Sequence, residues 1–286
     1  MPDIRHPDPQ WVIGKHALLN VHAKLRNGRT EIDPHAWRIP FQWQGCHYQD
    51  HDDQPFLLLI NSGGGFVEGD ASYFNGMLDA GTRTLVTTTA ASKYYKCLSG
   101  GSCEETVDFT VGPGAVLEYL PDEAIPFAKS RIRRHTTIEL APDSRLFATD
   151  MISAGRVHFG AGEEFMFSEL RSEFTIVVDG KPIISDRLLM ANAEEVEELK
   201  ELWAGARHMA TVFCYGAEWP ADIERSLETQ VDEIQGVTVG ASRIGGLIVV
   251  RILAEETWQA QDAIFSVWRV TRPLLCGKSA RRINKC

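Results

Sequence analysis

The densest group of metal-binding side chains lies in a short polar segment. Cys46, His47 and His51 carry the sulfur and nitrogen atoms that nickel, zinc or copper accept as ligands. Their spacing matches no known metal-site motif, and the surrounding polar residues indicate a surface loop. Ordinary surface residues are therefore the first interpretation, and the metal site of a metal-dependent hydrolase is the second.

A glycine-rich segment, Asn61 to Asp70, follows an apolar strand pattern and invites comparison with phosphate-binding loops. The dinucleotide-binding pattern fails because Glu68 stands where its third glycine is needed. Asp70 and Ala71 replace the Lys and the Ser or Thr of a nucleotide-binding loop, and a carboxylate repels phosphate. The segment therefore predicts a tight turn with positive φ angles.

Acidic side chains within otherwise apolar strand patterns are more informative. They are Asp70, Glu118, Asp150 and Asp186. A charge among buried residues is costly unless it is paired, hydrated or bound to a cation. Strand alternation offers a simpler explanation, in which each acid lies on a solvated face. Ser92 has no recognisable His and Asp partners, and no G-x-S-x-G motif indicates nucleophilic catalysis.

The elements that must position these side chains change character near residue 191. Strand patterns separated by turn signals run from about residue 14 to 190, which predicts a mainly β, many-stranded stacked-sheet body, sandwich or solenoid-like. A helical pattern at 193–203 comes first, and strands then alternate with helical patterns at 220–234 and 257–275 in the order β-α-β-β-α. We therefore expect a β-strand body at 1–190 and a smaller α+β part with a C-terminal helix at 191–286.

Composition excludes several classes of protein. In 286 residues, 44% hydrophobic content excludes disorder, and the short apolar runs exclude a membrane span. The net charge of −10 argues against nucleic acid and leaves cations or a basic protein surface as partners. The first residues do not form a secretory signal, so we expect a cytoplasmic protein with six free thiols.

Five segments, in register along most of the chain, resemble the urease accessory protein D family (UreD, also called UreH). They are Leu59 to Asp70, Thr87 to Tyr95, Leu117 to Phe127, Asp150 to Arg156 with Gly162 and Glu163, and Trp268 to Pro273 with Gly277 and Lys278. Two departures are Glu68, where the family usually has a second glycine, and the tail from Ala280 to Cys286, which lacks the family's Pro-Arg-aromatic ending.

The resemblance implies a non-enzymatic scaffold, or chaperone, for nickel insertion into urease apoprotein. Its implied partners are UreF, the GTPase UreG and urease apoprotein, in a dimer of heteromeric complexes. No tightly bound cofactor is expected, only transient Ni²⁺ in an internal, water-filled passage. The passage residues that the resemblance implies are Asp70, Ser92, Asp150 and Asp186. Oxygen ligands and water suit a metal in transit, because tight nitrogen or sulfur ligands would trap it.

The last helix and its end carry the residue types that favour protein interfaces. The predicted partner contacts are Trp258, Arg269, Arg272, Gly277 and Lys278. The competing interpretation is that the aromatic side chains of this helix belong to the core. A further alternative for the whole chain, a β-rich module that binds a small molecule or carbohydrate, predicts an exposed aromatic platform instead.

Overall fold

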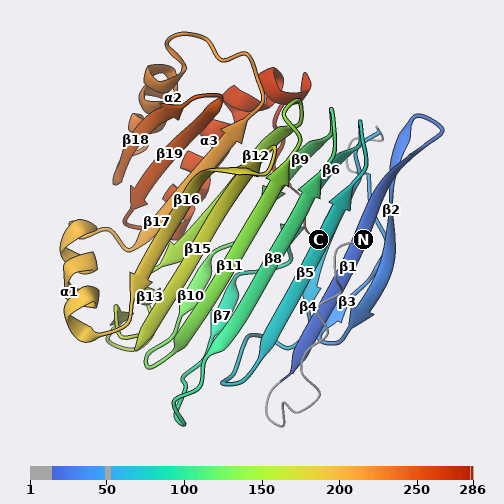
Figure 1. Ribbon diagram of the computed structural model, residues 1–286. Helices are drawn as coiled ribbons and strands as arrows, with labels where there is room; N and C mark the ends of the chain where they lie inside the picture. Colours follow the sequence, from blue (N-terminus) through green and yellow to red (C-terminus); the bar gives the residue numbers. More distant parts are fainter. Residues whose placement is uncertain (1–14, 49–52, 284, 286) are drawn as a thin grey trace.

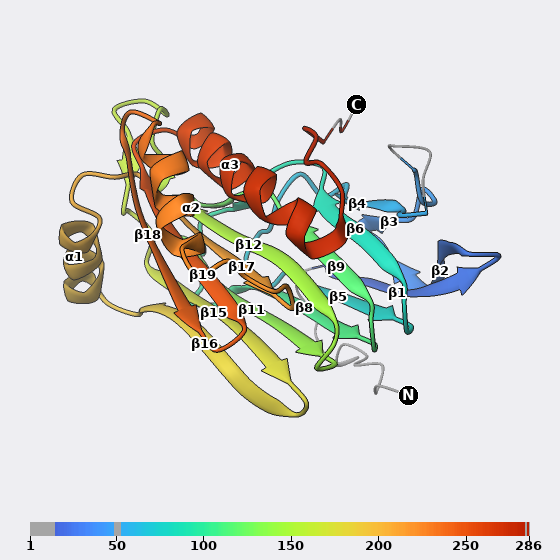
Figure 2. The same ribbon diagram turned by 90° about the horizontal axis from the view of Figure 1, so that it is seen from above.

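The computed structural model describes residues 15–48, 53–283 and 285, and two large β-sheets stacked face to face make up most of this part (Figures 1 and 2). The seven-stranded sheet contains, in spatial order, β16 (Lys181–Met190), β15 (Glu169–Val178), β11 (Arg131–Leu140), β8 (Cys103–Val111), β5 (Ala71–Leu78), β1 (His16–Arg26) and β2 (Arg29–Arg38). The ten-stranded sheet contains β18 (Val237–Ile244), β19 (Leu247–Ala254), β17 (His208–Tyr215), β12 (Arg145–Ser153), β9 (Val116–Leu120), β6 (Arg83–Thr88), β4 (Phe56–Asn61) and β3 (Phe41–Gln42), with β10 (Ala124–Pro126) and β7 (Ser92–Tyr94) beside this row. A small ribbon pairs β13 (Gly155–Arg156) with β14 (Glu163–Glu164).

The chain winds from one sheet to the other strand by strand. β5, β8, β11 and β15 belong to the seven-stranded sheet, while β6, β9 and β12 belong to the ten-stranded sheet. Neighbouring strands of this winding are parallel in both sheets. The predicted turn signals at 112–114 and 141–143 mark two of the crossings between sheets. The structure thus confirms the mainly β, stacked-sheet prediction.

Two predicted turns form tight hairpins. Asn27 and Gly28 join β1 to β2, and Asp179 and Gly180 join β15 to β16. All four residues have positive φ angles, between 50° and 75°. This conformation matches the twist of antiparallel strands and is tolerated best by Gly, Asn and Asp.

The C-terminal elements follow the order that the sequence predicts, with α1 (Ala193–Leu202), α2 (Ile223–Asp232) and α3 (Thr257–Cys276) interleaved with β17, β18 and β19. β17 pairs with β12, so the last three strands extend the ten-stranded sheet. α2 and α3 cover the outer face of this sheet, whereas α1 stands at one side (Figure 2). Among the described helices, none is both long enough and apolar enough to span a bilayer.

Strand alternation divides the interior into apolar clusters. The first cluster lies between the sheets and includes Phe74, Phe109 and Phe213. The second lies between the same sheets, nearer the opposite strand ends, and includes Ile132 and Ile152. A third cluster fills the space between the ten-stranded sheet and the helices α2 and α3. The two inter-sheet clusters are separated by polar residues, which form the candidate site.

Candidate functional site

A row of polar side chains crosses the interior between the two inter-sheet apolar clusters. We call it the polar belt; its members are Ser72, Glu105, Arg134, Ser172 and Asp186 from the seven-stranded sheet and Asp150, Thr211 and Arg251 from the ten-stranded sheet. Register places most of them side by side: Glu105 faces Ser72 and Arg134, and Thr211 faces Asp150 and Arg251. Most of them occupy an alternate strand position between inward-facing apolar residues, which fixes the direction of the side chain.

Arg134 is the centre of the belt and connects the two sheets. Its Nε donates to Glu105 Oε2 at 3.1 Å on the neighbouring strand, and its Nη1 lies 2.9 Å from Asp150 Oδ1 on the opposite sheet. Only 9% of the Arg134 side chain is exposed. Burial alone would lower the pKa of this guanidinium, but the negative charges of Asp150 and Glu105 outweigh it and raise the pKa well above the ordinary value. The residue is therefore a permanent buried cation.

Two hydroxyl groups position this central cluster. The Tyr94 hydroxyl donates to Glu105 Oε2 at 2.8 Å, and burial followed by the Glu105 charge raises the pKa of Tyr94 well above its ordinary value. Ser172 Oγ accepts from Arg134 Nη1 at 3.3 Å and donates to Asp150 at 3.5 Å. The carboxylates thus approach Arg134 in fixed orientations.

A cavity of about 110 Å³ adjoins one end of the belt. Its wall includes Ser72, Glu105 and Arg134 from the belt, and Asn61, Thr88 and Ser92 from the ends of strands in the other sheet. This volume holds several water molecules, and the lining offers them hydrogen-bond partners. The belt therefore continues into a polar space that water can occupy.

The other end of the belt reaches the surface at Asp186. Arg251 Nη2 contacts Asp186 Oδ1 at 2.6 Å, and Thr211 Oγ1 donates to Asp186 Oδ2 at 3.4 Å. The Arg251 side chain is 51% exposed, whereas that of Asp186 is 18% exposed. The belt contains three carboxylates and two guanidinium groups, which leaves one excess negative charge. The carboxylates are those of Glu105, Asp150 and Asp186, and the guanidinium groups are those of Arg134 and Arg251.

A second cavity, about 440 Å³, lies on the other side of the ten-stranded sheet beneath α3. Both cavities are bordered by residues 89–91 and by Pro121 and Asp122. Lys285 binds Asp122 at this shared border, with Nζ 2.6 Å from Oδ1. The loop that precedes Ser92 is thus a thin wall between two polar spaces.

The predicted passage residues occupy different surroundings. Asp150 and Asp186 belong to the belt, and Ser92 lines its cavity. Asp70 is buried near the belt, but its carboxylate accepts the backbone N–H groups of Lys15 at 2.7 Å and Val67 at 3.0 Å. Its observed contacts stabilise the glycine turn.

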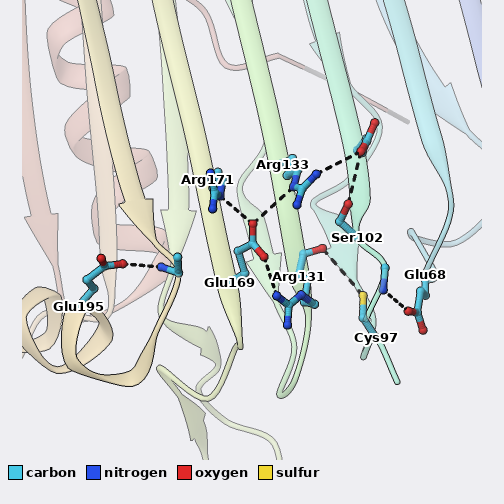
Figure 3. Close-up of polar contacts among 11 residues, drawn as sticks. Glu68, Cys97, Ser102, Arg131, Arg133, Glu169, Arg171 and Glu195 are labelled. Carbon is cyan, nitrogen blue, oxygen red and sulfur yellow. Dashed lines mark hydrogen bonds and ion pairs between the residues drawn. The ribbon is translucent and has the colours of Figure 1, made fainter. Parts of the chain in front are cut away.

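The glycine-rich segment forms the predicted tight turn, with φ angles of 71°, 143° and 85° at Gly64, Gly65 and Gly69. A Cβ atom at Gly65 would lie 2.7 Å from the Lys93 carbonyl oxygen, so only glycine fits there. Glu68 turns toward the neighbouring loop (Figure 3). There its carboxylate accepts hydrogen bonds from the backbone N–H groups of Leu98, Ser99 and Gly101. These three hydrogen bonds lower the pKa of Glu68. These three backbone N–H groups, which could otherwise bind an anion, are thus occupied by the protein's own carboxylate.

Of the three candidate metal ligands that carry sulfur or nitrogen, the structure describes Cys46 and His47. His47 is exposed and pairs through its backbone with Phe56, while Cys46 is half-buried against the first apolar cluster. His51 lies outside the described residues. Within those residues, no three His, Cys, Asp or Glu side chains form a group that could hold a metal ion, and the five described cysteines are free thiols.

The predicted partner contacts separate into exposed and structural residues. Trp258 is 57% exposed, and Arg269 is exposed on α3 with one hydrogen bond to Gln230. Arg272 is buried and binds Glu118, and Gly277 ends α3 with a φ angle of 70°. Lys278 reaches Asp53 at 2.9 Å.

Glu105 and Arg134 were missing from the sequence prediction, although a signal for both exists. Arg134 alternates with Ile132 and Ile138 in a strand pattern, so it must face inward with them. Glu105 shares a face with Cys103 and Val107 in the same way. A charged residue on the apolar face of a strand is the pattern that identifies both.

Comparison with known proteins identifies the class to which this chain belongs. The model of the family described as UreD urease accessory protein matches residues 15–285. The chain is 29% identical to the urease accessory protein UreD of Dechloromonas aromatica, over 95% of this chain and 93% of that protein. It is 31% identical to that of Klebsiella aerogenes, over 93% and 94% of the two chains. The chain therefore belongs to the UreD urease accessory protein family.

Proposed function

We propose that this chain is a non-enzymatic scaffold for nickel insertion into urease apoprotein, and that it acts in the cytoplasm with UreF and UreG. Family membership supports the urease accessory role. The observation that carries the more specific proposal is the polar belt, a row of carboxylates and hydroxyls that leads from an internal cavity to the surface between two apolar clusters.

The chemistry of the belt suits a divalent cation in transit. Carboxylate and hydroxyl oxygens, together with water, bind Ni²⁺ more weakly and release it more readily than imidazole and thiolate groups do. An excess of negative charge in an aqueous path favours cations over anions. We therefore propose that nickel follows the belt, with Ser92 at the cavity and with Asp150 and Asp186 along its length.

Asp150→Asn and Asp186→Asn, each in the full chain co-expressed with UreF, UreG and urease, test this route. Loss of either carboxylate is expected to lower the nickel content of purified urease several-fold, because the path loses a charged ligand and its excess negative charge. Co-purification of UreF and UreG, measured in parallel, must remain intact. Glu173→Gln is the matched control, because Glu173 is ion-paired to Arg187 on the outer face of the same sheet.

Unchanged nickel loading in both variants, with the complex assembled, would remove the passage from the proposal and leave the scaffold. For the scaffold, we propose that the exposed Trp258 and Arg269 contribute to binding UreF. Trp258→Ala should then weaken co-purification of UreF at equal expression, and full-strength binding would exclude this surface.

A further inference from the structure

The centre of the polar belt poses a problem for any cation that follows it. Two carboxylates from opposite sheets, Glu105 and Asp150, lie within reach of one guanidinium. Two converging carboxylates would hold a divalent cation in place, since affinity for such ions rises with the number of charged oxygen ligands. A retained ion would not reach the next protein.

Arg134 fills the position between these carboxylates. Its Nε donates to Glu105 and its Nη1 contacts Asp150, so one planar group compensates both charges at once. Lys could not reproduce this, because an ammonium group is a point charge without the fixed fork of donors. The cavity beside Arg134 gives the side chain and water room to rearrange when an ion arrives.

We infer that Arg134 is the residue that keeps the belt from retaining the cation: its guanidinium acts as a built-in counter-ion that a passing divalent ion displaces and that then returns. This inference rests on the proposed passage, whose regulation it describes. Arg134 thereby sets the affinity of the path, whereas the carboxylates set its preference for cations. Tyr94 and Ser172 are positioning residues, because they hold Glu105 and Asp150 toward the guanidinium.

The other arginine of the belt, Arg251, has different surroundings from Arg134. Arg251 compensates Asp186 at the surface, where half of its side chain is solvated. Removing Arg251 would leave a single carboxylate that water can hydrate. Removing Arg134 would leave two carboxylates facing one another in the interior. Only the second change is expected to create a retaining site.

Equilibrium dialysis with Ni²⁺ alone tests the inference on the full chain co-purified with UreF. Arg134→Met is expected to bind one additional nickel ion per chain, at least about tenfold more tightly than the wild type. Adding Glu105→Gln to this variant should abolish the gain, and Arg251→Met should show none. Nickel binding in Arg134→Met equal to that of the wild type overturns the inference, as does a gain that survives Glu105→Gln.

Arg134→Lys keeps the interior charge balanced and serves if Arg134→Met does not fold, which circular dichroism reveals. A lysine cannot fully compensate both carboxylates, so about threefold tighter nickel binding is expected, and wild-type affinity contradicts the inference. Urease is absent from these measurements. A failure of the proposed passage, seen as unchanged nickel loading in Asp150→Asn and Asp186→Asn, is therefore distinguishable from a failure of the inference, seen as unchanged nickel affinity.

Discussion

Two buried arginines form ion pairs with carboxylates in this protein, and their surroundings differ. Arg272 on α3 binds Glu118 on β9, and Trp268 and Gln54 each donate to the same carboxylate at 2.6 Å. Arg134 in the polar belt binds two carboxylates beside a cavity of about 110 Å³. Neither Glu118 nor Arg272 lines that cavity or the larger one beneath α3.

The comparison separates a structural ion pair from one that can exchange its partner. Glu118 is 1% exposed and receives donors from three side chains, so no ion could approach it without disrupting the contact between α3 and the sheet. Glu105 and Asp150 are 18% and 16% exposed. The chemical groups are the same in both places. Access to water decides which pair can open.

Arg272→Met is expected to have the largest effect on stability. It would leave Glu118 buried without its counter-ion, and breaking a buried pair in this way costs about 3–5 kcal/mol. Urea unfolding monitored by circular dichroism measures the change in the free energy of unfolding. Arg269→Gln, on the exposed side of the same helix, is the control. A loss below about 1 kcal/mol would mean that the pair beneath α3 is as adaptable as the belt.

Arg134→Met should cost less, about 1–3 kcal/mol, although it removes the partner of two carboxylates. The adjoining cavity allows water to hydrate Glu105, and Asp150 is itself 16% exposed, so solvation replaces part of the lost interaction. The same urea experiment compares the two variants directly. If Arg134→Met proves as destabilising as Arg272→Met, the distinction between the two regions is lost.

Glu169, at the start of β15, offers a third comparison: its side chain is buried, but its arginine partners are partly exposed. Glu169 lies among Arg131, Arg133 and Arg171 (Figure 3). Burial alone would raise the pKa of Glu169, but the charges and hydrogen bonds of these arginines outweigh it and lower the pKa. The ionised form therefore stabilises the fold at neutral pH, and this contribution is lost as the pH falls through the lowered pKa.

Glu169→Gln should thus reduce the free energy of unfolding by about 1 kcal/mol at pH 7, since the arginines are partly solvated. The difference from the wild type should shrink as the pH falls below the unfolded-state carboxyl pKa of about 4.3. Urea unfolding at pH 7 and at pH 3 measures this difference in the free energy of unfolding. A difference that stays constant between these two pH values would show that the charge of Glu169 contributes nothing to stability.

Much of this fold follows from local patterns. Alternating strands, Asn27 with Gly28, and the helical periodicity after residue 191 all depend on neighbouring residues, and the structure bears them out. The ion pairs do not follow in the same way. Glu118 meets Arg272 across 154 residues of sequence, and no local pattern connects them. Asp70 shows the same limit, because its partners are backbone N–H groups that only the folded chain brings together.

The winding of the chain between two sheets also bears on how this protein reaches its folded state. Parallel neighbours such as β8 and β11 are joined through β9 and β10 of the other sheet, so no hairpin can bring them together early. Such non-local pairing makes folding slow and leaves open sheet edges on incomplete chains. A newly made chain therefore faces a prolonged risk of aggregation, and the abundance of folded protein depends on the rate of folding as well as on the rate of synthesis.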